Sequence, residues 1–496
     1  MTLIKEFTTL SMGEKISFFQ ESFGASQELI IRTLTLRNKG KTNAALLYIN
    51  NIVKTADIQQ FILRPLLECR HFEKDIATIE EYLLNTIQIT KITKETDSNK
   101  LIDSLLSGST LILVENMTSI LVAETPDWQK RSVPSPVSER GRGSLLAFSE
   151  DLQMNQNMIR KVIKNEKLVF EPFSIGEKTN TSYSIVYSEE LVDRVVLDEL
   201  HRKLNNIKLD FVFDLNYLIE NLQEKKFSPF PLLMTTERPD TACSSILQGR
   251  IVIILDGTTK VIVLPVTLPI LLQAADDYYI RWELGLNRIF RFLGLLLTVL
   301  TPGLYISILN FHEELLPTSM YLNLISQSEG TPFPLVIEVF LLLIILQIIM
   351  DAIFRMNKDL ILVISILGTF IIGETAVNAG IIRPASIIII SLTFIANFIL
   401  PRQEDLSSAV RLLRISYLFA ANVLGFYGVM LLSFLFILHL SSLRSFGVPY
   451  LTPIAPFKLK EQQDTFIRSD LNSITNSTHK MPHEEMIKEK DQKNQK

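Results

Sequence analysis

The sequence predicts an α/β soluble head of two related subdomains, followed by an α-helical transmembrane bundle of four to six segments. Charged residues make up 21% of the 496 residues, and they crowd into residues 1–240 and the tail after 457. Long apolar runs occur only after Arg288. Two stretches of the head, offset by about 140 residues, share one pattern. A chain of this length exceeds one hydrophobic core, so we expect separate head and membrane parts.

The repeat is clearest in two segments of the head that align without a gap. They are LLSGSTLILVENMTSILV from Leu105 and ILQGRIVIILDGTTKVIV from Ile246. Each contains a Gly, an apolar run, a turn and a second apolar run. The turn is Glu-Asn in the first copy and Asp256-Gly257 in the second, and Gly readily adopts the positive φ of a two-residue hairpin. Both segments are therefore predicted to form β-hairpins.

Upstream of each hairpin, the segments from Ala44 and Tyr183 both read as a short apolar strand followed by an amphipathic helix. This second match favours duplicated α/β units, although convergent patterning is the alternative because hairpin signals are common. The Pro-, Gly- and Arg-rich stretch between the units is a linker by composition, and Ser149 is the expected N-cap of the helix after it. The head divides into an N-terminal amphipathic segment at 1–24, a first subdomain at 25–130, a linker with the start of a helix at 131–159, and a second subdomain at 160–287.

Five apolar runs predict the membrane bundle at 288–440, because a helix needs ~20 apolar residues to cross the hydrocarbon core. Core helices of a soluble protein are the alternative. A membrane-proximal motif at 441–457 and a polar tail at 458–496, expected to be disordered, follow the bundle. The predicted spans are 288–309, 335–353, 360–379, 384–400 and 412–440.

Basic residues predict the orientation of these spans, since they collect in cytoplasmic loops. Arg288 and Arg291 precede the first span, whereas the loop after it has no Lys or Arg. This puts the head inside, in agreement with a start that lacks a signal peptide. Five crossings then leave the lysine-rich tail outside, against the charge rule. Either the segment at 384–400 is re-entrant, or the last run breaks near Gly425 and Gly428.

Several classes of protein are disfavoured by what the sequence contains. We find no phosphate-binding loop, dinucleotide fingerprint, nucleophile elbow or zinc-protease motif, so we expect no enzyme and no cofactor. Cys69 and Cys243 have no metal-ligand spacing, and the six histidines suggest no metal site. His312 beside two glutamates reads as a solvated cluster. A formal net charge of −4 does not suggest a nucleic-acid partner.

Polar side chains inside the apolar runs are the candidate functional residues, because a polar group in hydrocarbon is costly unless it is paired or hydrated. Glu374 and Asn378 lie four residues apart on one helix face, so we expect the third span to line a pore. Hydrogen bonding between helices is the alternative. Glu338 and Asp351, near predicted span ends, read as interfacial carboxylates. The candidate pore-lining or intramembrane polar residues are Ser365, Thr369, Glu374, Asn378, Asn397 and Gln347.

Several motifs give the chain a resemblance to the A-subunit family of nutrient germinant receptors from spore-forming bacteria. They include TERPD, ILQGRIVIILDGTTKVIV, FHEELLPT, EGTPFP and HLSSLRSFGVPYLTPIAPF, and the resemblance covers nearly all of residues 15–457. The family-motif residues are Glu237, Arg238, Pro239, Asp240, Gly249, Asp256, Gly257, Arg444, Gly447 and Pro449.

The resemblance implies a subunit of a receptor in the inner membrane of the bacterial spore, with its head on the cytoplasmic (core) side. It implies a permease-like B subunit and a lipoprotein C subunit as partners. It also implies that the chain forms a homo-oligomeric ion channel, which opens in response to nutrient and starts germination. The alternatives are a component of a solute or ion transporter, for which the short run after Pro384 is the clue, and a receptor scaffold that does not conduct.

Overall fold

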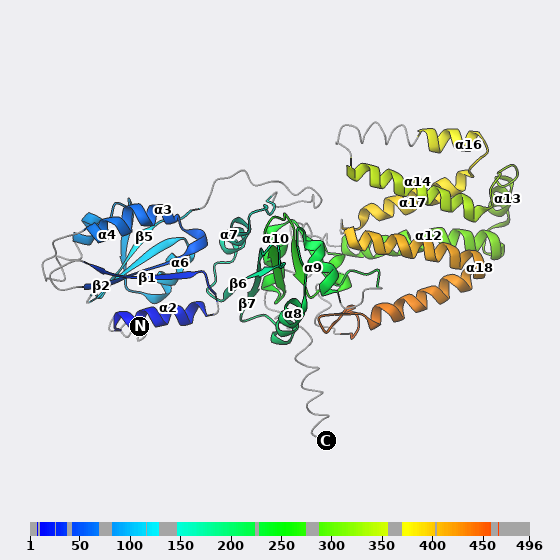
Figure 1. The fold of residues 1–496 in the computed structure, drawn as a ribbon. Coiled ribbons are helices and arrows are strands. Elements are labelled where there is room, and N and C mark those ends of the chain that lie inside the picture. The colour runs from blue at the N-terminus through cyan, green and yellow to red at the C-terminus, as the bar shows by residue number, and fades with distance from the viewer. Residues whose placement is uncertain are drawn as a thin grey trace, which may run out of the picture. The chain divides into compact units, whose positions relative to one another are not determined.

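The computed structural model forms two compact units (Figure 1). The head unit comprises Met1–Gln223 and Thr235–Pro265, together with Thr478–Lys496. The helical unit comprises Glu224–Met234 and Val266–Ser477. The structure describes residues 7, 10–24, 26–36, 42–68, 82–115, 117–127, 146–223, 228–273, 287–355, 370–401, 404–457 and 465.

Two five-stranded antiparallel sheets with one strand order form the framework of the head. The first runs β1-β2-β4-β5-β3 and the second β6-β7-β9-β10-β8, so each strand of one sheet has a counterpart in the other. The first sheet consists of β1 (Leu29–Leu36), β2 (Thr42–Ile49), β3 (Ile92–Glu95), β4 (Ser109–Val114) and β5 (Ile120–Glu124). The second consists of β6 (Leu168–Ile175), β7 (Thr181–Ser188), β8 (Met234–Thr236), β9 (Ile251–Leu255) and β10 (Val261–Leu264).

Both predicted hairpins are present, as β4–β5 and β9–β10. Every residue of β9 and β10 is buried, which explains their continuous apolar runs in place of alternation. Gly257 in the second turn has φ 81°, and its N–H donates to the carbonyl of Glu150. The Asp256 carboxylate accepts the N–H of Leu152 at 3.1 Å. The turn therefore also holds the start of the helix that precedes the second sheet.

Helices pack on both sheets, and in Figure 1 α2 lies below the first sheet and α3 and α4 above it. The N-cap of α7 is Asp151 rather than the predicted Ser149, because the Asp151 carboxylate accepts the N–H of Met154. Ser149 instead accepts the N–H of Asp151. The head helices are α2 (Met12–Phe23), η1 (Asn50–Ile52), α3 (Thr55–Asp57), η2 (Ile58–Leu63), α4 (Arg64–Glu68), α6 (Ser98–Leu106), α7 (Leu152–Val162), α8 (Arg194–Asn206), α9 (Leu215–Leu222) and α10 (Pro239–Leu247).

A buried ion pair ties the start of the first sheet to the start of the second. Arg160 in α7 and Glu28, just before β1, approach to 2.5 Å, and their side chains are 1% and 5% exposed. The guanidinium also donates to the carbonyls of Asn165 and Leu168, and it lies 4.9 Å from the centre of the Phe170 ring. These partners compensate the buried charge of Arg160, and the contact fixes Glu28 against β6.

The helical unit contains α11 (Leu268–Leu271), α12 (Asn287–Phe311), η5 (Glu313–Leu315), α13 (Thr318–Ser326), α14 (Leu335–Arg355), η6 (Phe370–Thr375), α16 (Ala376–Asn378), α17 (Pro384–Ile399), α18 (Glu404–Ser442) and the strands β11 (Arg444–Ser445) and β12 (Val448–Pro449). Among the described residues two helices are long and apolar enough to cross a membrane, Asn287–Phe311 and Leu406–Ser442. The apolar helices Leu335–Ile349 and Pro384–Ile399 are shorter. The predicted number of four to six spans is therefore not established, and most of the predicted span 360–379 lies outside the described residues.

The predicted span 412–440 is not one straight crossing, because the chain reverses inside α18 at Gly425. This residue has φ 59° and ψ −138°, which are not helical. The Tyr417 hydroxyl donates to the Ser433 hydroxyl at 3.0 Å, whereas sixteen residues of straight helix would separate them by about 24 Å. A Cβ on Gly425 would lie 2.9 Å from the Phe311 ring, so only glycine fits. The second half of α18 returns toward the end at which α12 begins (Figure 1).

Candidate functional site

The most connected polar contact of the helical unit is a junction around Ser445. Its hydroxyl accepts the N–H of Val266 at 3.1 Å and donates to the carbonyl of Leu232 at 2.6 Å. Ser445 is fully buried. One small hydroxyl therefore joins three segments that are about 180 and 210 residues apart in the sequence.

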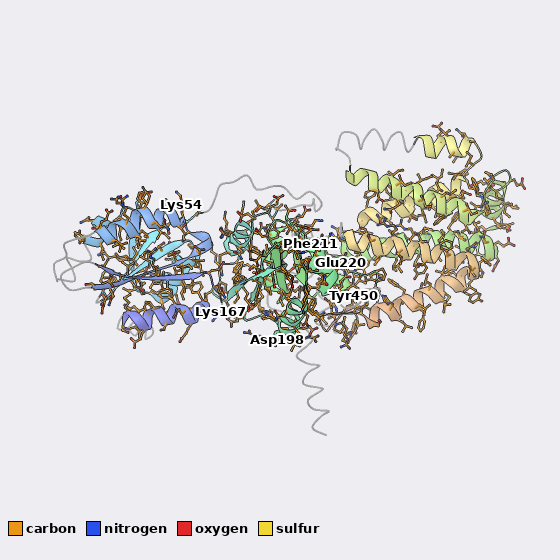
Figure 2. The ribbon with its side chains drawn as sticks, in the orientation of Figure 1. Lys54, Lys167, Asp198, Phe211, Glu220 and Tyr450 are labelled. Atoms are coloured by element: carbon orange, nitrogen blue, oxygen red, sulfur yellow. The ribbon has the colours of Figure 1, made fainter. Side chains whose placement is uncertain are left out.

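Further contacts surround Ser445. The carbonyl of Tyr450, labelled in Figure 2, accepts the N–H of Leu268 at 2.8 Å. The Phe230 ring lies 5.4 Å from that of Phe436 and 6.3 Å from that of Tyr450, as centroid distances. Ser228 and His439 are hydrogen-bonded at 3.0 Å. We call this set of residues the collar: Ser228, Phe230, Leu232, Val266, Leu268, Phe436, His439, Ser445 and Tyr450.

The C-terminal family motif forms the outer part of the collar. Arg444 and Ser445 pair with Val448 and Pro449 as the two-stranded sheet β11–β12. The turn between them needs positive φ, which Gly447 adopts at 84° and Phe446 at 49°. The motif residues Arg444, Gly447 and Pro449 thus build the hairpin that presents the Ser445 hydroxyl.

Chain connectivity gives the collar its functional interest. A single proline separates Val266 from the end of β10, and a single residue separates Leu232 from the start of β8. β10 and β8 are neighbours in the second sheet. The two chain segments that run from this pair of strands into the helical unit are both held by Ser445.

Glu338, predicted from the sequence to be an interfacial carboxylate, is buried within the helical unit. It is 1% exposed, and its Oε1 accepts the backbone N–H of Arg383 at 2.7 Å. Its Oε2 lies 3.5 Å from the Arg383 guanidinium. Because Arg383 is the N-cap of α17, the carboxylate on α14 faces the positive end of another helix. The short helix α17 therefore begins at a buried ion pair.

Arg414 is the partner of the predicted residue Asn397. Its guanidinium donates to the carbonyl of Thr298 at 3.0 Å and to the Asn397 side-chain oxygen at 3.4 Å, and Arg414 is 7% exposed. These contacts join α18, α12 and α17. The sequence analysis did not single out Arg414, although a basic residue inside the predicted span 412–440 was a signal for it.

The rest of the predicted polar stripe is not brought together. Gln347 donates to Asp351 on its own helix at 2.6 Å. Glu374 and Asn378 are exposed, and within the described part of the chain no hydrogen bond or ion pair joins them to Asn397. The candidates Ser365 and Thr369 lie outside the described residues.

The head motif TERPD forms the start of α10. Pro239 occupies the first turn. The guanidinium of Arg238 donates two hydrogen bonds, of 3.0 and 2.6 Å, to the Asp240 carboxylate. The preceding residue, Glu237, accepts the N–H of Phe148 with its carbonyl. Burial, and secondarily the Asp240 charge, raises the pKa of the Cys243 thiol to about 12, so this cysteine stays protonated.

Two further features bear on the predicted sites. Gly249 has φ 82°, and a Cβ there would lie 2.5 Å from the carbonyl oxygen of Leu191. His312, predicted to be solvated, packs against the rings of Phe426 and Tyr427, and its Nδ1 lies 3.5 Å from Glu314. Among the described residues no three His, Cys, Asp or Glu side chains are grouped to hold a metal ion.

The structure defines a class of protein that combines an α/β head with helices long and apolar enough to cross a membrane. Residues 17–480 match the model of the Bacillus/Clostridium GerA spore germination protein family, and the chain belongs to this family. That family comprises spore germination proteins and is not a known class of enzyme. The resemblance stated from the sequence motifs is thereby confirmed.

Individual relatives cover most of the chain. The uncharacterized membrane protein YfkQ of Bacillus subtilis (strain 168) is 36% identical over 87% of this chain and 84% of its own. Spore germination protein KA of the same organism is 33% identical over 92% and 84%, and spore germination protein GerLA of Bacillus cereus is 30% identical over 92% and 93%. The crystal structure of the N-terminal domain of the A subunit of the Bacillus megaterium spore germinant receptor GerK3 aligns with 51% of this chain and 94% of its own, at 26% identity and a TM-score of 0.40.

Proposed function

We propose that this chain is the A subunit of a spore germinant receptor and mediates nutrient-triggered germination. It acts as an oligomeric ion channel in the inner membrane of the spore, with the head on the core side. A permease-like B subunit gates the channel, and a lipoprotein C subunit completes the receptor. Membership of the germination family supports this role, and the collar is the observation that carries the mechanism.

The collar supports gating because it converts a change at two strands into a displacement of a helix end. β8 and β10 are continuous with the segments that Ser445 holds. Ser445 is the third residue after the end of α18. A nutrient-loaded partner that favours one arrangement of these strands shifts the equilibrium between closed and open helices by its differential affinity. The Arg414 contacts then carry the movement to α12 and α17.

The intramembrane polar residues supply the path for ions in this proposal. The third apolar run, with Ser365, Thr369, Glu374 and Asn378, lines the pore. Exposed carboxylate and amide groups on an apolar segment need water or another subunit beside them, which supports an oligomer with a hydrated centre. Residues 25–130 and 160–287 are duplicated subdomains, a division that the shared strand order supports.

Ser445→Ala tests the coupling. The substitution leaves the Val266 N–H and the Leu232 carbonyl without their partner, at a cost of about 1–3 kcal/mol for each buried group. We expect spores carrying it to contain the normal amount of the protein in the membrane. Cation release after addition of a nutrient mixture, followed with a potassium electrode, falls at least about tenfold.

The matched control is Ser441→Ala, whose exposed hydroxyl bonds only to the Ile437 carbonyl one turn earlier. This variant should release cations at the native rate. Normal release by the Ser445→Ala spores would overturn the coupling role. Reduced membrane content with unchanged release per molecule would assign Ser445 to folding alone.

A transporter is the second candidate, because α17 starts in the interior of the unit at the Glu338 pair and so resembles the broken helices that bind substrates. Flux through the purified complex in liposomes separates the candidates. A channel passes cations down their own gradient in the absence of any substrate gradient, whereas a transporter requires the substrate. A scaffold passes nothing in either condition.

A further inference from the structure

The segment after α12 carries apolar side chains that no described part of the chain covers. α13 has no buried residue, and neighbouring η5 has none either. Leu315, Met320 and Leu322 are 64%, 51% and 60% exposed, and Ile325 is 37% exposed. Large apolar side chains gathered in one short segment mark a contact surface. We call residues 313–329 the α13 surface.

The α13 surface is acidic as well as apolar. Glu313, Glu314 and Glu329 are all exposed. From the residue after Arg291 to the residue before Arg355, the sequence contains no Lys or Arg. Three carboxylates thus border the uncovered apolar side chains, with no basic residue of the same segment to balance them.

This combination selects among the possible occupants of the surface. Helices that lie on membranes carry Lys and Arg, which anionic headgroups attract, and these carboxylates are repelled instead. A second copy of this chain would bring the same three carboxylates, and like charges set against each other disfavour a contact. A protein surface with basic side chains complements both features of the segment.

We infer that the α13 surface docks a different protein, in an apolar groove bordered by Lys or Arg. Leu322 and Ile325, three residues apart on one face of α13, are the anchors that enter the groove, in the manner of a helix that presents apolar side chains to a partner. The carboxylates meet the basic rim and fix the orientation. The partner meets the chain at the C-terminal end of α12. This helix has 25 residues and is therefore about 37 Å long.

The proposal is tested by photo-cross-linking in the intact membrane with the full-length chain. A p-benzoylphenylalanine group replaces Leu322, and in a parallel strain it replaces Val423, which is 69% exposed on α18. We expect an adduct between position 322 and another protein, mapped by mass spectrometry to a peptide that contains Lys or Arg. Position 423 gives no such adduct.

Charge is tested separately. The variant Glu313→Gln/Glu314→Gln/Glu329→Gln should lower the yield of the adduct at least about fivefold. The control neutralises three exposed head carboxylates, as Glu150→Gln/Glu177→Gln/Glu190→Gln, and should leave the yield unchanged. An adduct with lipid, an adduct with a second copy, no adduct, or an unchanged yield in the first variant would each overturn the inference. None of these outcomes depends on whether the chain conducts ions.

Discussion

At the scale of single residues, the buried charges decide how the parts of each unit are held. Arg160 contacts a carboxylate, two carbonyls and an aromatic face, whereas Arg414 contacts a carbonyl and a side-chain amide. Removing one member of a buried ion pair leaves the other charge without compensation. The Glu28 pair is therefore the residue-level contact on which the head depends most.

Arg160→Met should lower the free energy of unfolding of the head by about 3–5 kcal/mol, because Glu28 is then buried without its cation. Pulse proteolysis of the full-length protein over a urea series measures this. The control Arg202→Met breaks an ion pair whose arginine is 69% exposed, and it should cost less than about 1 kcal/mol. Equal urea midpoints for the two variants would show that the buried ion pair stabilises the head no more than the exposed ion pair does.

Residue-level prediction from the sequence succeeded where one residue type dictates local geometry. Asp256-Gly257 specified a hairpin because its turn needs positive φ, and the turn is present. The burial of Glu338 was not predicted, because its partner Arg383 lies 45 residues away and a span-end position says nothing about what another helix contributes. The burial of a carboxylate depends on tertiary neighbours, which one sequence does not reveal.

At the scale of elements, the reversal in α18 is the largest difference between expectation and structure. The sequence analysis allowed a break near Gly425 and Gly428 as one of two ways to reconcile the basic tail with the spans. Glycine alone does not decide this, since apolar helices tolerate it. The decisive contacts are the Tyr417–Ser433 bond and the close approach of Phe311, both of which are long-range.

Gly425→Val should disfavour the reversal, because a β-branched residue at positive φ is strained by about 1–2 kcal/mol and its Cβ also meets Phe311 at 2.9 Å. Disulfide formation between paired Tyr417→Cys and Ser433→Cys substitutions reports the reversal, and Gly425→Val should reduce its yield severalfold. Gly373→Ala is the control, since nothing lies within 4 Å of its added Cβ. A high yield in the Gly425→Val background would contradict this account of the turn.

At the scale of the whole molecule, the ends of α12 and α18 determine the sidedness of the chain. The start of α12 is held to the linker from β10, where Arg291 donates to the Leu272 carbonyl. The end of α18 is held in the collar to the same linker. Membrane-crossing helices that leave and return at one end cross an even number of times, so we expect the basic tail to lie on the same side as the head.

The molecule-scale prediction is that Glu177→Cys in the head and Phe457→Cys after the collar react from one side of the membrane, and Ser319→Cys in α13 from the other. All three positions are exposed. An impermeant maleimide applied to vesicles of each orientation, with both native cysteines replaced, gives the answer. Labelling of Phe457→Cys together with Ser319→Cys would show an odd number of crossings.

Part of the domain organisation could be predicted from the sequence. The segregation of apolar runs separated the head from the helices, and the pattern after Leu105 and Ile246 revealed the repeated hairpin. The edge strands β3 and β8 were not predicted, because four and three residues carry no periodicity. The collar was also missed, since its bonds join residues 179 and 213 positions apart.

The reversal at Gly425 also constrains how the chain is made. No polar loop separates residues 404–424 from residues 426–442. The two halves of α18 would therefore enter a membrane together, as a helical hairpin. Until Ser433 arrives, the Tyr417 hydroxyl has no partner in hydrocarbon, and the first half is costly to release alone. For a membrane-inserted chain, the Tyr417 hydroxyl therefore gains its partner only after synthesis has passed the turn.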